Sequence, residues 1–95
     1  MALMFLLVDH ITDESLFEEY EADAGSVLDR YPHELVAYDE AARPVERLED
    51  TRRVVAVRFD SEEAFHAFYH SPEYQAAIGK RFGATDGFAL LVHVA

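Results

Sequence analysis

The chain has 95 residues, of which 51% are hydrophobic and 28% are charged, a balance typical of one globular domain and not of a disordered segment. Nineteen acidic residues against eight basic ones give a net charge of −11, which repels phosphate backbones and anionic membrane surfaces. We therefore expect no nucleic-acid and no membrane partner. The absence of cysteine excludes a disulfide-stapled secreted domain, and the longest apolar run, residues 2–8, is too short for a membrane helix. We expect a cytoplasmic location.

The first half of the chain predicts strand, helix, strand. Residues 2–8 are apolar at both alternating sets of positions, which indicates a strand buried on two faces. A helix is predicted over residues 13–31, because apolar residues recur there at helical spacing after the capping candidates Thr12 and Asp13. The Tyr31-Pro32 pair is expected to end it. Residues 34–39 alternate as a strand, and residues 45–49 are predicted to continue it at the sheet edge after a turn.

The second half predicts a strand, a two-part helical region and a last strand. Residues 53–59 indicate an interior strand, and Asp60 or Ser61 can cap the helix that follows. Ser71-Pro72-Glu73 is a second helix start, with a serine cap and a proline at the first helical position. Tyr74, Ile78 and Phe82 are predicted to share the buried face of that helix, and Gly83 to end it. Residues 87–94 indicate the final strand.

The order of these elements is β-α-β-β-α-β, which predicts an α+β, ferredoxin-like fold with a four-stranded antiparallel sheet. Helices cover only one face of such a sheet, yet three of the predicted strands are apolar on both faces. Soluble monomers rarely leave an apolar patch larger than about 300–600 Å² uncovered. We therefore expect residues 1–95 to form a single domain that assembles as a homodimer, a dimeric α/β barrel in which two sheets pack together.

Two stretches carry a family resemblance. Residues 13–20 (Asp-Glu-Ser-Leu-Phe-Glu-Glu-Tyr) and 59–75, above all the segment Tyr69-x-Ser-Pro-Glu-Tyr-Gln75, resemble the family known as domain of unknown function 1330. The resemblance implies a dimeric α/β-barrel domain, related in fold to cofactor-free antibiotic-biosynthesis monooxygenases, haem-degrading monooxygenases, muconolactone isomerases and EthD-like proteins. It implies no particular reaction, because the family has none assigned.

Metal and cofactor patterns are weak. Glu62, His66 and His70 stand one helical turn apart and could ligate Zn²⁺, but they are predicted to point away from the core face into solvent. The acidic residues between Asp13 and Asp23 lack the spacing of a calcium loop and fit a solvated helix face. No metal and no cofactor is expected.

Polar residues inside strand patterns are the better functional signal, since a charge at an interior position is costly unless it is paired or serves a site. Arg58, His93 and Asp9 interrupt apolar strand phases. If the site is catalytic, Arg58 is the residue expected to stabilise a developing oxyanion, and His93 or His10 is expected to act as the base. Asp9 is the first choice as the carboxylate that holds Arg58; Glu40, Glu46 or a carboxylate of a second subunit are the alternatives.

The predicted binding residues are Asp9 and four tyrosines, Tyr20, Tyr38, Tyr69 and Tyr74, which could line a pocket between helices and sheet. Such a pocket suits a small hydrophobic organic molecule, in a binding protein or in a cofactor-independent monooxygenase- or isomerase-like enzyme. The alternative is a non-catalytic homodimeric module with a structural or ligand-sensing role.

Overall fold

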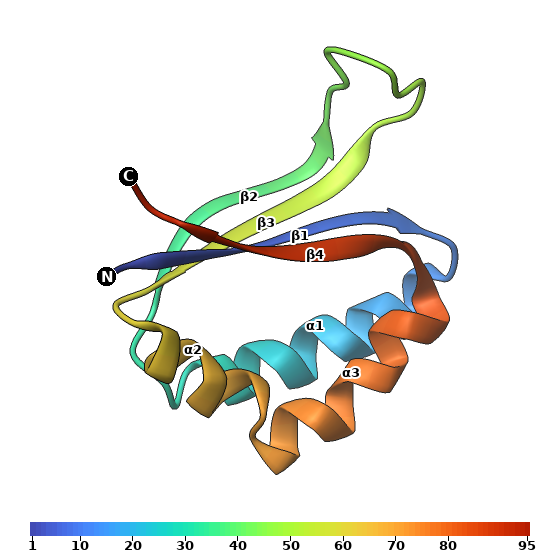
Figure 1. Ribbon diagram of the computed structural model, residues 1–95. Coiled ribbons are helices and arrows are strands. Elements are labelled where there is room, and N and C mark those ends of the chain that lie inside the picture. Colours follow the sequence, from blue (N-terminus) through green and yellow to red (C-terminus); the bar gives the residue numbers. More distant parts are fainter.

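The computed structural model describes residues 1–95 as four strands and three helices (Figure 1). One antiparallel sheet has the strand order β2-β3-β1-β4, so the third strand lies between the first and the second. This is the predicted ferredoxin-like order, and that prediction is confirmed. No helix is both long and apolar enough to cross a membrane. In chain order the elements are β1 (Leu3–Ile11), α1 (Glu14–Leu28), β2 (Glu34–Ala42), β3 (Arg52–Phe59), α2 (Glu62–Tyr69), α3 (Pro72–Ala84) and β4 (Thr85–His93).

The helices begin where capping side chains predict. The side chains of Asp13, Ser61 and Ser71 each accept a hydrogen bond from the backbone N–H three residues on, at 3.1–3.2 Å. Two predicted ends are wrong. Helix α1 stops at Leu28, three residues before Tyr31, and α3 runs through Gly83 to Ala84 and passes directly into β4.

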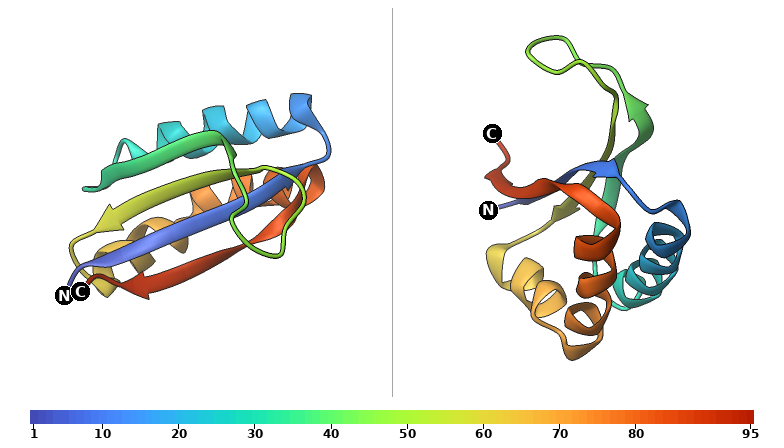
Figure 2. Two further views of the ribbon diagram at one scale, coloured as in Figure 1. Left: turned by 90° about the horizontal axis from the view of Figure 1, so that it is seen from above. Right: turned by 90° about the vertical axis from the view of Figure 1, so that its right-hand side faces the viewer.

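The predicted strand over residues 45–49 is also wrong. Residues 43–51 form an irregular loop between β2 and β3, which we call the β2–β3 arm. Figures 1 and 2 show that the arm rises away from the sheet on the side opposite the helices. The pairing of β2 with β3 ends at Ala42 and Arg52, and the apolar side chains Val45 and Leu48 of the arm are exposed.

The two faces of the sheet differ in what covers them. All three helices lie against one face, which we call the covered face (Figure 2). The core packs there, and its aromatic rings make edge and stacked contacts between helices and sheet, such as Phe59 with Phe65 and Phe68 at centroid distances of 5.6 Å. The buried cluster comprises Phe5, Leu7, Phe17, Tyr20, Val27, Val57, Phe59, Phe65, Phe68, Tyr74, Ile78 and Ala84.

The opposite face, here called the outer face, is apolar and uncovered. Residues paired across an antiparallel sheet point to the same side, so Leu6 shares this face with its partners Ala56 and Leu90. Phe88 and Leu90 remain 54% and 51% exposed. The prediction that the helices leave one apolar sheet face uncovered therefore agrees with the structure. The apolar residues of this face on β1, β3 and β4 are Met4, Leu6, Val8, Val54, Ala56, Phe88, Leu90 and Val92.

Candidate functional site

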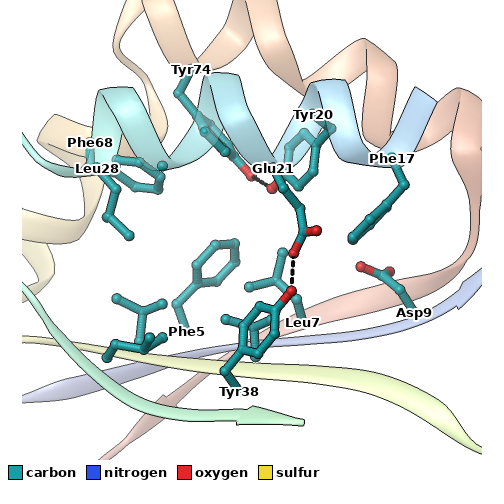
Figure 3. Close-up of a pocket in the computed structure, with 15 residues that line it drawn as sticks. Phe5, Leu7, Asp9, Phe17, Tyr20, Glu21, Leu28, Tyr38, Phe68 and Tyr74 are labelled. Atoms are coloured by element: carbon teal, nitrogen blue, oxygen red, sulfur yellow. Dashed lines mark hydrogen bonds between the residues drawn. The ribbon is translucent and has the colours of Figure 1, made fainter. Parts of the chain in front are cut away.

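A cavity of about 200 Å³ lies between the covered face and the helices (Figure 3). Its sheet side is formed by β1, β2 and β3, and its helix side by α1, α2 and α3. It opens between α1 and β2, where the lining residues Gly25, Leu35 and Tyr38 are exposed. Twelve of the fifteen lining residues are hydrophobic: the full lining is Phe5, Leu7, Asp9, Phe17, Tyr20, Glu21, Ala24, Gly25, Leu28, Leu35, Tyr38, Val55, Val57, Phe68 and Tyr74.

Two phenols meet on the helix side of the cavity. The Tyr20 hydroxyl, from α1, and the Tyr74 hydroxyl, from α3, are hydrogen-bonded to each other at 2.8 Å. Figure 3 shows the two side chains pointing toward one another across the cavity from Phe5 and Leu7. Burial raises the pKa of both phenols, that of Tyr20 well above its usual value, so both are protonated at neutral pH.

A second polar group lies at the opening of the cavity. The Glu21 carboxylate, on α1, accepts hydrogen bonds from Tyr38 on β2 at 2.5 Å and from Arg53 on β3 at 2.9 Å. The Arg53 guanidinium also lies over the Phe17 ring, 4.9 Å from its centroid. Burial and the hydrogen bond to Glu21 raise the pKa of Tyr38 to about 12. These three residues form a polar cluster in which the neutral Tyr38 phenol, the Glu21 carboxylate and the Arg53 cation contact one another. The cluster connects helix α1 to strands β2 and β3.

The most buried ion pair joins Asp9 on β1 to Arg81 on α3. Arg81 donates from Nε and Nη2 to the two Asp9 oxygens at 3.0 and 2.7 Å, a bidentate geometry, and both side chains are buried. Burial lowers the pKa of Arg81, but the Asp9 carboxylate outweighs it and raises that pKa overall. Gly87 on β4 makes room for the pair, because a Cβ there would lie 2.3 Å from the Val8 carbonyl oxygen and 2.6 Å from Asp9 Oδ1.

The predicted pair of Arg58 with Asp9 is wrong. Arg58 alternates with Ala56 and Val54 and so points to the outer face, whereas Asp9 lies on the covered face, opposite Arg53 on β3. Arg58 instead binds Asp60, two residues on, at 3.0 Å. The alternatives Glu40 and Glu46 do not hold it either, since Asp60 is its salt-bridge partner.

Sequence reasoning did not select Arg81, the residue that does hold Asp9. It placed Phe82 with Tyr74 and Ile78 on the buried helix face, but Phe82 is 63% exposed. At about 100° per residue, Arg81 lies some 20° from the direction of Tyr74, while Phe82 lies about 80° away. Angles calculated at 100° per residue therefore predict that Arg81 is buried, and a buried arginine requires a carboxylate partner.

The predicted binding residues mostly come together, while the predicted catalytic residues do not. Asp9, Tyr20, Tyr38 and Tyr74 line the cavity, but Tyr69 lies outside its lining and packs against Phe5.

The three residues predicted to be catalytic are exposed or half-exposed and stand apart from one another. Arg58 is opposite Met4 and His93 is opposite Leu3, near one end of the sheet but on different faces. His10 lies near the other end of β1, opposite Asp86. None of the three lines the cavity, and their catalytic role stays a prediction.

The fold and its cavity define an α+β, ferredoxin-like protein with an internal apolar site. Residues 1–95 match the family described as Domain of unknown function (DUF1330), and the protein belongs to this family. The resemblance carried by residues 13–20 and 59–75 is thereby confirmed. No curated protein matches the sequence.

Solved structures share the fold at low sequence identity. A protein of unknown function from Rhodopseudomonas palustris has a TM-score of 0.84 and 17% identity, covering 99% of this chain and 82% of that one. SnoaB, a cofactor-independent oxygenase from Streptomyces nogalater, has a TM-score of 0.71 and 16% identity, covering 99% and 93%. A dimeric ferredoxin-like protein of unknown function from Thermobifida fusca has a TM-score of 0.69 and 14% identity, covering 99% and 92%. The fold is thus shared by an enzyme and by uncharacterised proteins.

Proposed function

We propose that the protein binds a small, largely apolar organic molecule in the cavity between the sheet and the helices. The observation that carries this is an aromatic-walled cavity of about 200 Å³ with few polar groups, the composition expected of a ligand site. In another protein an apolar cavity of about 150 Å³ takes up benzene. A substituted single aromatic ring therefore suits the volume.

The charges around the cavity favour a neutral ligand. The two carboxylates in the lining, Asp9 and Glu21, are already paired with Arg81 and Arg53. An anionic molecule would meet both carboxylates and find no free cation, and the chain as a whole carries −11. A cation would have to compete with two bound guanidinium groups.

α-Methylstyrene, a neutral single-ring hydrocarbon, is a suitable probe for the cavity. Titration into isotope-labelled protein is expected to shift the amide resonances of lining residues such as Phe5, Leu7 and Phe68. The Gly25→Leu variant is expected to abolish these shifts, because Gly25 borders the opening and a Cβ there meets no atom within 4 Å, so the added side chain can obstruct the cavity without a clash.

Gly79→Leu is the matched control. Gly79 is also in a helix with open space around an added Cβ, but it lies outside the cavity. The control variant is expected to bind the probe as the wild type does. Unchanged binding in Gly25→Leu, or shifts confined to the outer face, would contradict the proposal.

The proposal includes a homodimer in which a second copy covers the outer face. Phe88 and Leu90 expose an apolar surface on the face of the sheet that no helix covers. The T. fusca neighbour is a dimeric protein. The β2–β3 arm rises on this same side (Figure 1) and carries the exposed Val45 and Leu48, so the proposed second copy could also contact the arm. A two-fold axis through the face would bury it against itself.

Light scattering at micromolar concentration tests the assembly, with about twice the chain mass expected for the wild type. Leu90→Glu is expected to give a monomer, because it places a charge among the apolar side chains of the outer face, beside Leu6. Ala76→Glu, which adds the same charge at an exposed residue on α3, is expected to leave the dimer intact. A wild-type monomer, or equal dissociation of both variants, would contradict this part of the proposal.

The likeness to SnoaB favours a second candidate, a cofactor-independent oxygenase- or isomerase-like reaction in the same cavity. A non-catalytic structural or ligand-sensing dimer is the alternative, and it predicts that a bound molecule is recovered unchanged after prolonged incubation with oxygen. Product formation that Gly25→Leu abolishes would favour the enzyme. The cytoplasmic location stays a prediction from the sequence.

A further inference from the structure

The hydroxyls of Tyr20 and Tyr74 carry two O–H hydrogens between them but make only one hydrogen bond, to each other, at 2.8 Å. Whichever hydroxyl donates in that bond, the hydrogen of the other has no acceptor within the protein. Both residues line the cavity, and they are only 6% and 1% exposed. A buried donor without an acceptor is costly, so this hydrogen favours any ligand that supplies one.

The other polar atoms of the cavity are already engaged. Both Asp9 oxygens accept from Arg81, and the two Glu21 oxygens accept from Arg53 and from Tyr38. The unmatched polar group that faces the cavity is therefore a donor, and the complementary ligand group is an acceptor.

Building on the proposed function, we propose that the cavity selects neutral single-ring molecules bearing an acceptor oxygen, such as an aryl ketone or aldehyde. Its carbonyl oxygen accepts the free hydrogen of the Tyr20–Tyr74 pair. The ring lies against Phe5, Leu7 and Phe68, which form the apolar remainder of the lining. A carboxylate-bearing ligand is disfavoured, because Asp9 and Glu21 line the same cavity.

Acetophenone and α-methylstyrene form a matched pair of probes, since they differ only in a C=O group replaced by C=CH₂. The quantity to measure is the ratio of their dissociation constants, acetophenone over α-methylstyrene, by NMR titration. In the double variant Tyr20→Phe/Tyr74→Phe this ratio is expected to rise about 2- to 10-fold, the usual contribution of one hydrogen bond. The affinity for α-methylstyrene itself should not fall.

The single variants Tyr20→Phe and Tyr74→Phe sharpen the test. Each leaves one hydroxyl that has lost its partner and can turn its hydrogen to the ligand, so the ratio is expected to stay close to the wild-type value. Tyr31→Phe removes a hydroxyl outside the cavity lining and is the control, with no change expected. A purely structural role of the pair, holding α1 to α3, would alter the affinity for both probes equally.

The infrared C=O stretch of acetophenone bound to the wild type gives a second readout that needs no variant. It is expected at lower frequency than in hexane, because the carbonyl accepts a hydrogen bond. An unshifted band, or an unchanged ratio in the double variant while α-methylstyrene still binds in the cavity, would overturn this inference and leave the proposed function standing. Absence of α-methylstyrene from the wild-type cavity would overturn both.

Discussion

Three arginine–carboxylate pairs in this molecule differ chiefly in how far they are removed from solvent. The side chains of Arg81 and Asp9 are 6% and 3% exposed, those of Arg53 and Glu21 are 12% and 29% exposed, and those of Arg58 and Asp60 are 38% and 82% exposed. The shortest N–O distances are nearly equal, 2.7, 2.9 and 3.0 Å. Distance alone therefore does not rank these pairs.

The ranking comes from what each carboxylate would face if its arginine were removed. Asp9 would be left as a charge among apolar groups, Glu21 would be partly hydrated at the cavity opening, and Asp60 is in water already. The energetic role of a salt bridge thus follows from desolvation, and the three pairs offer a graded series within one fold.

The largest effect is expected from Arg81→Ala, which leaves the Asp9 carboxylate buried without a partner. The free energy of unfolding should fall by about 3–5 kcal/mol. Urea denaturation at fixed protein concentration measures it, since the stability of the proposed dimer would depend on concentration. In the combined variant Asp9→Leu/Arg81→Met no charge is left behind, and most of the loss should be recovered. A loss below about 1 kcal/mol for Arg81→Ala, the value of an exposed pair, would contradict the buried pair.

The Asp9–Arg81 pair also shows which features of the fold can be predicted from the sequence and which cannot. The order of strands and helices and the uncovered sheet face follow from local patterns of apolar residues, and the sequence predicts them. It predicts the Ser71 cap directly, and it gives Asp13 and Ser61 each as one of two neighbouring cap candidates. It does not predict the partner of Asp9, because Arg58 and Asp9 both interrupt an apolar strand phase and nothing local tells which strand residues share a face. Only the pairing register Met4–Arg58 and Asp9–Arg53 fixes that.

Only some of the residues that line the cavity could be predicted from the sequence, for a similar reason. Tyrosines at helical spacing indicated an aromatic wall, and Tyr20 and Tyr74 do line the cavity. Glu21 was not selected, because on the sequence it is one more acid on an exposed helix face. Its contacts at the opening are with Tyr38 on β2 and Arg53 on β3, at sequence separations of 17 and 32 residues. Contacts of this kind are set by tertiary packing.

Gly87→Ala is expected to have the next largest effect and to sharpen the case for the Asp9–Arg81 pair. The added Cβ would overlap the Val8 carbonyl oxygen and the Asp9 carboxylate, and the strand backbone cannot move away without breaking the sheet. We expect a loss of about 1–3 kcal/mol in the free energy of unfolding, as for other overpacked sites. Gly79→Ala, with open space around the new Cβ, should instead stabilise α3 by about 0.5–1 kcal/mol. Equal effects of the two substitutions would rule out the close approach.

Arg53→Ala should fall between the buried and the exposed pair. It removes the hydrogen bond to Glu21 and the contact with the Phe17 ring, but the Glu21 carboxylate regains water at the cavity opening. A loss of about 1–2 kcal/mol is expected, larger than for an exposed pair and smaller than for Arg81→Ala. Because Arg53 also helps to hold Tyr38 against α1, hydrogen exchange should become faster in β2. If Arg53→Ala lowered the free energy of unfolding as much as Arg81→Ala does, the ranking of the pairs by burial would be wrong.

The smallest effect is expected from Arg58→Ala, at about 0–1 kcal/mol, because both members of the Arg58–Asp60 pair are exposed. A double-mutant cycle separates this pair from the one that sequence reasoning favoured. Arg58→Ala and Asp9→Asn lie on opposite faces of the sheet, so their effects on the free energy of unfolding should add within about 0.3–0.5 kcal/mol. Arg81→Ala and Asp9→Asn should instead show a coupling of about 0.5–3 kcal/mol. Since Arg58 lies on the outer face, both cycles are measured at two protein concentrations, which separates changes in association from changes in folding. Coupling of Asp9 to Arg58 but not to Arg81 would contradict both the assigned partner of Asp9 and the ranking of the three pairs by burial.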